Sequence, residues 1–213
     1  MELESTAFSE LSCRAFTERL AAKQPVPGGG GAAAMAGALA AALGSMAGHY
    51  TEGKKKYAVY ETELMEMLAQ LEEIRTRLLD AIEADAAAFA PLSRAYGIPK
   101  DDPGRDAALQ QATEAAALPP LTMMREAGRI IPLLVKMASF GNRMMVSDIG
   151  CGLVLAEAAV RCAAFSVLIN TAAMRDREKA AELEREADAL LQDCVPAARE
   201  AADRIQKEIR ART

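Results

Sequence analysis

The chain has 213 residues, of which 51% are hydrophobic and 4% aromatic, with no tryptophan and a formal net charge of −5. This length fits one domain with a sizeable core, and the acidic balance argues against nucleic acid as a partner, because neutralising phosphates requires a basic face. One histidine and four cysteines without CxxC spacing argue against a zinc site and a disulfide framework. Glu2 and Glu4 do not fit the basic start of a signal peptide. We therefore expect a cytoplasmic protein with reduced thiols and no metal.

Helical periodicity accounts for nearly the whole chain, and no segment is typical of a strand of useful length. We predict an all-α protein, a single domain over residues 1–213 that forms an antiparallel bundle of about six to seven helices, two of them long. Helices of such length in a chain of this size usually pair in an oligomer. The expected helices cover 12–23, 32–50, 59–96, 105–117, 119–141, 147–174 and 177–210.

A run of proline and glycine at 25–31 opens straight into the alanine-rich second helix, which stops before Lys54, Lys55 and Lys56. Glycines without Cβ let the backbone come close to a ligand or a neighbouring chain, and the free N–H groups of the following first turn favour a carboxylate or phosphate. The alternatives are a tight turn and a solvated lysine cluster. No strand precedes the glycines and no Gly-Lys-Ser/Thr follows them, which excludes a dinucleotide fingerprint and a P-loop.

The second helix is long enough to span a bilayer, and between Gln24 and Tyr50 only His49 can carry charge. Its residues are mostly alanine and glycine, whose transfer into lipid is weakly driven, so we predict a buried central helix instead. The helix 147–174 is apolar nearly all round and is also expected to be central. Small residues form one smooth face of the second helix, where another helix can approach closely: Gly37, Ala41, Gly44 and Gly48.

Two carboxylates break the apolar pattern. Asp85 falls on the buried stripe of helix 59–96, between Ile82 and Phe89. Burying a carboxylate is costly unless it is paired, and that cost is tolerated where a perturbed pKa is useful; a structural ion pair or an edge position is the alternative. Asp148 follows Ser147 at the start of the most apolar helix, where a helix-capping or first-turn acid is the simpler interpretation.

Several short pieces follow one another along the chain: PVPGGG at 25–30, TEGKKKY at 51–57, DAAAF at 85–89, IPK at 98–100, Pro119, GN at 141–142, SD at 147–148 and VLIN at 167–170. Each piece is weak alone. In their order and spacing, over about 16–176, they resemble the cyclodeaminase/cyclohydrolase family of folate enzymes, which includes the C-terminal part of formiminotransferase-cyclodeaminase and free-standing methenyltetrahydrofolate cyclohydrolases.

The resemblance implies an all-helical homodimer with a folate site near the subunit contact and chemistry at the N5–C–N10 bridge of tetrahydrofolate. The reaction is either formiminotetrahydrofolate cyclodeamination, which releases ammonia and forms 5,10-methenyltetrahydrofolate, or hydrolysis of 5,10-methenyltetrahydrofolate. Neither needs a metal or redox cofactor, so we expect a tetrahydrofolate derivative as substrate, no cofactor, and neither a membrane nor nucleic acid as partner.

The resemblance also implies roles for individual residues. Asp85 is the expected proton-transfer residue, because both reactions pass through a tetrahedral carbon and move protons. Asp148 is expected either to share that transfer or to accept the N–H groups of the pterin. A lysine is expected to hold the glutamate tail of folate. The residues expected to bind substrate are Pro27, Gly28, Gly29, Gly30, Lys54, Lys55, Tyr57, Lys100, Asn142, Ser147 and Asn170.

Two positions depart from the family pattern. Gly31 stands where the family usually has serine, and Ser166 stands where it usually has the asparagine of an Asn-Val pair. The lost serine hydroxyl beside the glycines bears on ligand recognition. Two alternatives to an active enzyme therefore stay open, namely a catalytically inactive folate-binding paralogue and a structural helical oligomer.

Overall fold

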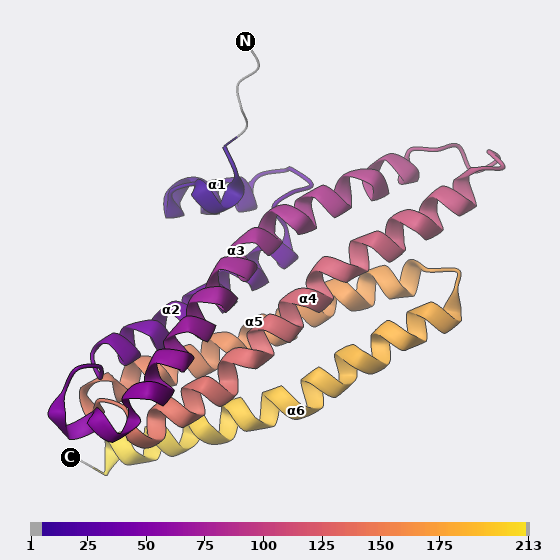
Figure 1. Cartoon of the computed structure of the whole chain (residues 1–213). Coiled ribbons are helices and arrows are strands. Elements are labelled where there is room, and N and C mark those ends of the chain that lie inside the picture. Colours follow the sequence, from indigo (N-terminus) through magenta and orange to yellow (C-terminus); the bar gives the residue numbers. More distant parts are fainter. Residues whose placement is uncertain (1–5, 212–213) are drawn as a thin grey trace.

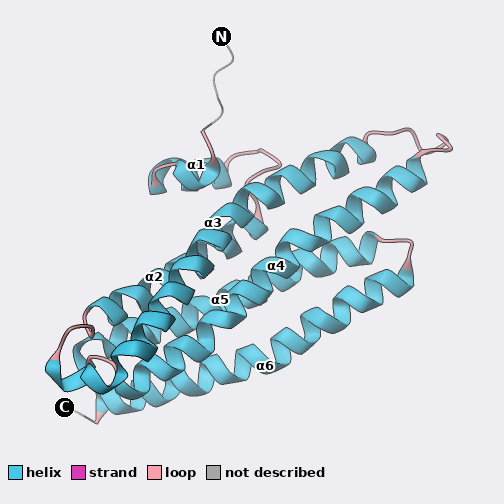
Figure 2. Cartoon of the chain, viewed as in Figure 1, coloured by secondary structure: helices cyan, strands magenta, loops and turns pink. Residues whose placement is uncertain are grey.

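The computed structural model describes residues 6–211, so Glu2 and Glu4 lie outside the described residues. Every regular element in this part of the chain is helical (Figures 1 and 2), which confirms the predicted all-α class. Short 3₁₀ helices lie at Phe8–Glu10, Lys55–Tyr60 and Arg143–Met145. The α-helices are α1 (Cys13–Ala21), α2 (Gly29–His49), α3 (Glu61–Tyr96), α4 (Arg105–Phe140), α5 (Val146–Ala173) and α6 (Arg177–Arg210).

Two predicted helix boundaries are wrong. The expected helices 105–117 and 119–141 form one continuous helix, α4, which runs through Pro119, Pro120 and Pro132. A proline in a helix interior costs about 3 kcal/mol, but α4 packs against α3 and α5 along its length, and this packing outweighs the local preference. The second helix begins at Gly29 rather than at residue 32, so the glycines form its first turn instead of a loop before it.

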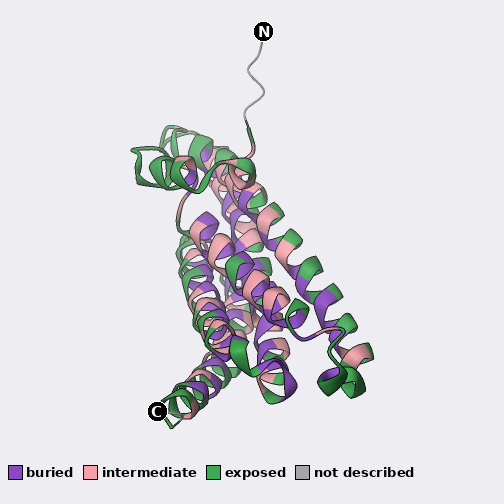
Figure 3. Ribbon diagram, turned by 90° about the vertical axis from the view of Figure 1, so that its left-hand side faces the viewer, coloured by how far each residue is buried: buried purple, intermediate pink, exposed green. Residues whose placement is uncertain are grey.

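The small residues of α2 form its buried face, as predicted. A Cβ built on Gly37 would lie 2.9 Å from Cδ1 of Leu78 in α3, and one on Gly44 would lie 2.8 Å from Cδ2 of Leu134 in α4. Leucine side chains of α3 and α4 therefore occupy the space that larger α2 residues would fill. This contact lets α3, α4 and α5 all pack on α2, and buried positions line the facing sides of the long helices (Figure 3).

The opposite face of α2 and one face of α5 are apolar and open. Leu39, at the middle of α2, is 50% exposed, and Phe165 and Ile169 of α5 are 73% and 70% exposed. By length and composition α2 and the segment 143–173 could each cross a membrane, but about half of the most apolar stretch of each is buried inside the bundle. The prediction that helix 147–174 is central is thus correct for one side of α5 and wrong for the other.

The bundle extends beyond the start of α2. The α3–α4 and α5–α6 hairpins have their tips at the same end of the molecule (Figure 1), where Arg175 forms an ion pair with Asp106 and Gln110 accepts hydrogen bonds from the backbone N–H groups of Arg175 and Asp176. α2 begins only at Gly29, so the other long helices run on past its first turn (Figure 1).

We predict that Gly44→Leu lowers the free energy of unfolding by about 1–3 kcal/mol or more, because the added side chain must displace Leu71 and Leu134 from a close-packed contact. Ala69→Leu, at an exposed position of α3, is the control and should change stability by less than about 0.5 kcal/mol. Urea unfolding followed by far-ultraviolet circular dichroism measures both. Equal midpoints for the two variants would contradict this account of the α2 contact.

Candidate active site

The first turn of α2 brings the glycines against Asp85. Gly28 is the N-cap of α2 and offers no side chain to the free N–H groups of the first turn. Gly30 is buried and faces α3, where a Cβ on Gly30 would lie 2.5 Å from Oδ2 and 2.7 Å from Oδ1 of Asp85. Only glycine therefore leaves room for the Asp85 carboxylate at the positive end of the α2 dipole. Two of the predicted site elements, the glycines and Asp85, meet within one chain.

Asp85 is half-buried, as its place on the apolar stripe of α3 predicts. Within residues 6–211, no donor lies at hydrogen-bonding distance from its carboxylate, and no cation pairs with it. Burial accordingly raises the pKa of Asp85 above its usual range, because the charged form loses hydration. An ionised carboxyl whose pKa is raised is a stronger proton acceptor than an ordinary carboxylate, which suits general acid–base catalysis.

A groove of about 710 Å³ opens beside the same turn, between Gly29 of α2 and the second half of α5. Phe165, Ser166 and Ile169 line it. Asn170 lies one helical turn beyond Ser166, where its Nδ2 donates to the carbonyl oxygens of Ser166 (2.8 Å) and Ala116 (3.0 Å).

These groups lie at one level of the bundle. The ion pair between Arg77 of α3 and Glu126 of α4 shows which turns of those antiparallel helices lie side by side, and by that register Asp85 is level with the turn of α4 around residues 116–118. Asn170 of α5 contacts the same turn of α4 through Ala116. The open end of α2 is therefore surrounded by an acid from α3, an amide from α5 and an apolar groove.

The predicted residues of the basic segment lie at the other end of α2. Thr51 is fully buried, and its Oγ1 accepts a hydrogen bond from the backbone N–H of Asn142 (2.9 Å). The Asn142 side chain donates from Nδ2 to the carbonyl of Tyr50 (2.8 Å) and accepts at Oδ1 from the N–H of Met144 (3.1 Å). Asn142 thus ties the end of α2 to the start of α5, and this connection uses one of the two N–H donors of its side chain.

The lysines of the basic segment and Asp148 lie at the same end of α2 as this connection. Lys54, Lys55 and Lys56 are exposed, and in the described part of the chain no carboxylate lies within ion-pair distance of them. Tyr57 is buried beneath Lys56, whose Nζ lies 5.3 Å from the centre of the ring. Asp148 is half-buried in the first turn of α5, and Ser147 donates to it at 3.4 Å.

One chain does not assemble all the predicted residues in one place. Twenty residues of helix separate Gly30 from Tyr50, which puts the two ends of α2 about 30 Å apart. Asp85 and Asp148 lie at these opposite ends, and Lys100 lies in the turn at the tip of the α3–α4 hairpin, beyond Asp85. We call the first group the glycine half-site (Pro27, Gly28, Gly29, Gly30, Asp85 and Asn170) and the second the lysine half-site (Lys54, Lys55, Tyr57, Asn142, Ser147 and Asp148).

Phe165 and Ile169 beside Gly29 are not among the predicted site residues, because helix 147–174 is expected from its sequence to be buried on all sides. This helix has more apolar residues than one buried face needs, and that excess is the only sequence signal for an apolar outer face. Among residues 6–211, no cluster of three or more histidine, cysteine, aspartate or glutamate side chains could hold a metal ion.

Comparison with known proteins identifies the family. Residues 12–189, well over half of the chain, match the family described as Formiminotransferase-cyclodeaminase. The chain belongs to this family. The resemblance based on the short sequence pieces is therefore confirmed.

Members of the family differ in length and in name. A methenyltetrahydrofolate cyclohydrolase of Methylorubrum extorquens is 39% identical over 180 residues, which are 83% of this chain and 86% of that protein. A formimidoyltransferase-cyclodeaminase of Dictyostelium discoideum is 34% identical over 185 residues, 87% of this chain but 34% of that protein, so the chain spans about a third of that relative's length. The crystal structure of formiminotetrahydrofolate cyclodeaminase from Thermotoga maritima superposes with a TM-score of 0.80 at 31% identity and covers 92% of this chain and 98% of that one.

We predict that Asp85→Asn stabilises the protein at neutral pH. Burial raises the pKa of Asp85 in the folded state, so folding is opposed once pH rises above the usual carboxyl pKa, and a neutral amide removes that opposition. At about pH 3, where aspartate is protonated even when unfolded, the variant and the wild type should have similar stability. Asp80→Asn, which removes an exposed carboxylate from the same helix, is the control. Urea midpoints at both pH values test this, and a variant less stable than the wild type at pH 7 would contradict it.

Proposed function

We propose that this chain is a folate enzyme acting at the N5–C–N10 bridge of tetrahydrofolate, and that it hydrolyses 5,10-methenyltetrahydrofolate to the 10-formyl derivative. The unpaired, half-buried Asp85 at the open start of α2 carries this proposal, because it supplies a proton acceptor where the backbone leaves room for a ligand. The relative named as a cyclohydrolase supports this choice, since it matches over nearly its whole length. Formiminotetrahydrofolate cyclodeamination is the second candidate, supported by the likeness to the Thermotoga maritima structure.

Both reactions give the same task to Asp85. In hydrolysis, water attacks the methenyl carbon, the carboxylate takes one proton from that water and passes it to N5 as the C–N5 bond breaks, and the remaining hydroxyl proton goes to solvent as the formyl C=O forms. In deamination, N10 attacks the carbon of the protonated formimino group and loses its proton to the carboxylate, which returns that proton to the NH₂ group so that ammonia leaves. A raised pKa suits an acid that must do both. Asp148 shares the proton transfer or accepts the N–H groups of the pterin.

We further propose that two copies of the chain complete each site. The glycine half-site and the lysine half-site are opposite in charge and lie at opposite ends of α2. A two-fold axis across the middle of α2 would place the start of one helix beside the end of its partner. The dimer would then contain two sites, each made of the glycine half-site of one copy and the lysine half-site of the other. The folate would then lie with its reacting carbon at Asp85 and its acidic tail toward the partner's lysines or toward Lys100.

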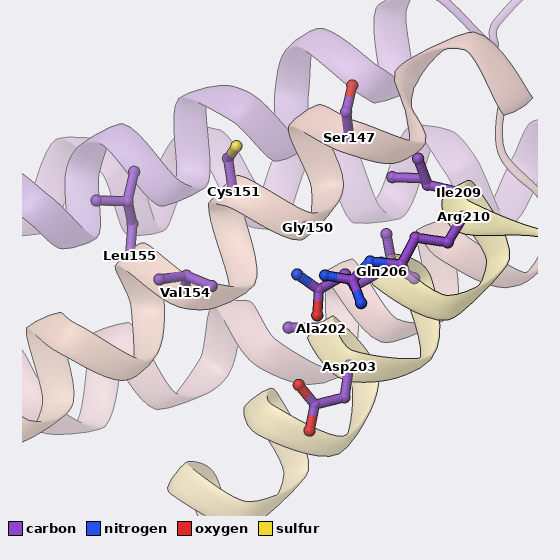
Figure 4. Close-up of a pocket in the computed structure, with 11 residues that line it drawn as sticks. Ser147, Gly150, Cys151, Val154, Leu155, Ala202, Asp203, Gln206, Ile209 and Arg210 are labelled. Carbon is purple, nitrogen blue, oxygen red and sulfur yellow. The ribbon is translucent and has the colours of Figure 1, made fainter. Parts of the chain in front are cut away.

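The apolar face supports a second copy as the occupant. Leu39 is exposed at the midpoint of α2, where the axis would pass. On α5 the same open face carries the exposed Phe165, and a hollow of about 670 Å³ lies nearer the start of this helix, between Val154 of α5 and Ile205 and Ile209 of α6. Figure 4 shows the residues of this hollow, with Val154 of α5 on one side and Ala202 and Gln206 of α6 on the other. A large exposed side chain and a hollow on the same side of α5 suit an isologous contact.

We predict that the purified protein accelerates the loss of near-ultraviolet absorbance of 5,10-methenyltetrahydrofolate beyond the spontaneous rate. Asp85→Asn should reduce kcat at least about a hundredfold, the usual contribution of a positioned acid or base, while Asp80→Asn leaves it unchanged. Failure of the wild type on this substrate and on the formimino substrate would contradict the enzyme proposal. Folate binding without turnover would then favour the inactive paralogue, and no binding would favour a structural oligomer.

Mixing two inactive variants tests the shared site. In a dimer of one Asp85→Asn subunit and one subunit carrying Lys54→Ala and Lys55→Ala, both changes fall in one site and the other site is intact. After exchange of subunits at equal amounts, about a quarter of wild-type activity should return, since random pairing makes half of the dimers mixed. A mixture of Asp85→Asn with Gly30→Ala is the matched control, because both changes fall in the glycine half-site and no intact site forms. Full activity of the lysine variant on its own would assign the folate tail to Lys100, and with that variant inactive, equal activity in the two mixtures would exclude a shared site.

A further inference from the structure

Pro120 leaves a backbone carbonyl of α4 without its usual donor. In an α-helix the carbonyl of Ala116 would accept from the N–H of residue 120, and proline has none. Asn170 of α5 takes the place of that donor, with its Nδ2 at 3.0 Å from the Ala116 oxygen. Ala116 is buried, so water could not replace this bond without opening the α4–α5 contact. The proline and the asparagine, fifty residues apart in the sequence, are thus two halves of one interaction.

This interaction fixes which way the Asn170 amide faces. Both of its close partners, the carbonyls of Ala116 and Ser166, are acceptors only, so the NH₂ group must face them. The amide oxygen then points away from both, and in the described part of the chain no donor lies within hydrogen-bonding distance of it. Asn170 is therefore held as a hydrogen-bond acceptor, with both donor hydrogens used inside the fold.

The oriented amide lies at the glycine half-site. Asn170 is one turn beyond Ser166, which lines the groove beside Gly29, and it contacts the turn of α4 that is level with Asp85. An acceptor held in this place matches a ligand that presents N–H groups. The pyrimidine portion of a reduced pterin, with its ring N–H and exocyclic amino group, has that chemistry.

We infer that Pro120 is a positioning residue for substrate recognition: by freeing the Ala116 carbonyl it engages the Asn170 Nδ2 and leaves the amide oxygen as an acceptor at the level of the glycine half-site, where that oxygen accepts a hydrogen bond from the pterin. This inference rests on the proposed function for the identity of the ligand, whereas the locked orientation rests on the α4–α5 contact alone. Pro119 provides the contrast, because the carbonyl that it frees belongs to Ala115, which is exposed and accepts no side-chain hydrogen bond among the described residues.

The test combines Pro120→Ala, Asn170→Leu and the double variant, with Pro119→Ala as the matched control. Pro120→Ala supplies the missing N–H, so Asn170→Leu should lower the urea midpoint less in that background than in the wild type. For substrate, Asn170→Leu should raise KM about tenfold, as expected for one lost hydrogen bond. Pro120→Ala should raise KM severalfold with kcat little changed, and the double variant should be no worse than Asn170→Leu alone. Pro119→Ala should leave KM unchanged.

Each outcome decides a separate point. Additive urea midpoints would overturn the coupling between Pro120 and Asn170. Coupled midpoints with an unchanged KM in both single variants would overturn the recognition role and leave a structural one. If the wild type turns over neither folate substrate, the proposed function fails first, and the dissociation constant for tetrahydrofolate replaces KM as the readout. Tetrahydrofolate that binds the wild type and all four variants equally, or binds none of these five proteins, would also overturn the inference.

Discussion

The rest of the structure depends on the close contact of α2 with its neighbours. Glycine and alanine on its inner face admit leucine side chains from α3 and α4, so α2 lies deep among three longer helices. Its larger residues, such as Leu39, are left on the outside. This reverses the usual arrangement, in which large apolar residues face the core. Because side chains of its neighbours fill the space at its inner face, α2 keeps its larger apolar residues on its outer face. We assign this apolar outer face to a contact between subunits.

The contact also sets the position of the acid. The register that places Leu78 against Gly37 also places Asp85 against Gly30, two turns nearer the start of α2 and two turns nearer the end of α3. Asp85 occupies a position that an apolar residue would fill elsewhere on the stripe, and burial raises its pKa in consequence. Packing that favours a neutral side chain thus holds a carboxylate, and we expect that ionised group to lower the stability of the protein at neutral pH.

Much of the fold follows from the sequence alone, because helical periodicity and the glycine face of α2 are local patterns. The errors in what the sequence predicted have one physical cause. The continuity of α4 through Pro119 and Pro120 depends on packing, and for Ala116 on an amide from α5, and neither is visible within the window around the prolines. The meeting of Gly30 with Asp85 was predicted through a resemblance, whereas the separation of Asp85 from Asp148 depends on the direction of each helix.

The length of α2 then explains why the site that we propose needs two copies of the chain. The helix is long enough to bury its small residues against three partners, and its ends are therefore about 30 Å apart. Each end carries the charge that the helix dipole favours, a carboxylate beside the first turn and lysines after the last. Compensation of the helix dipole accounts for the charges at both ends of α2, but charged groups exposed to solvent would compensate it equally well. It does not account for the burial of Asp85 or for the open apolar face between the ends, whereas antiparallel pairing of two such helices joins the acid of one to the lysines of the other across that face.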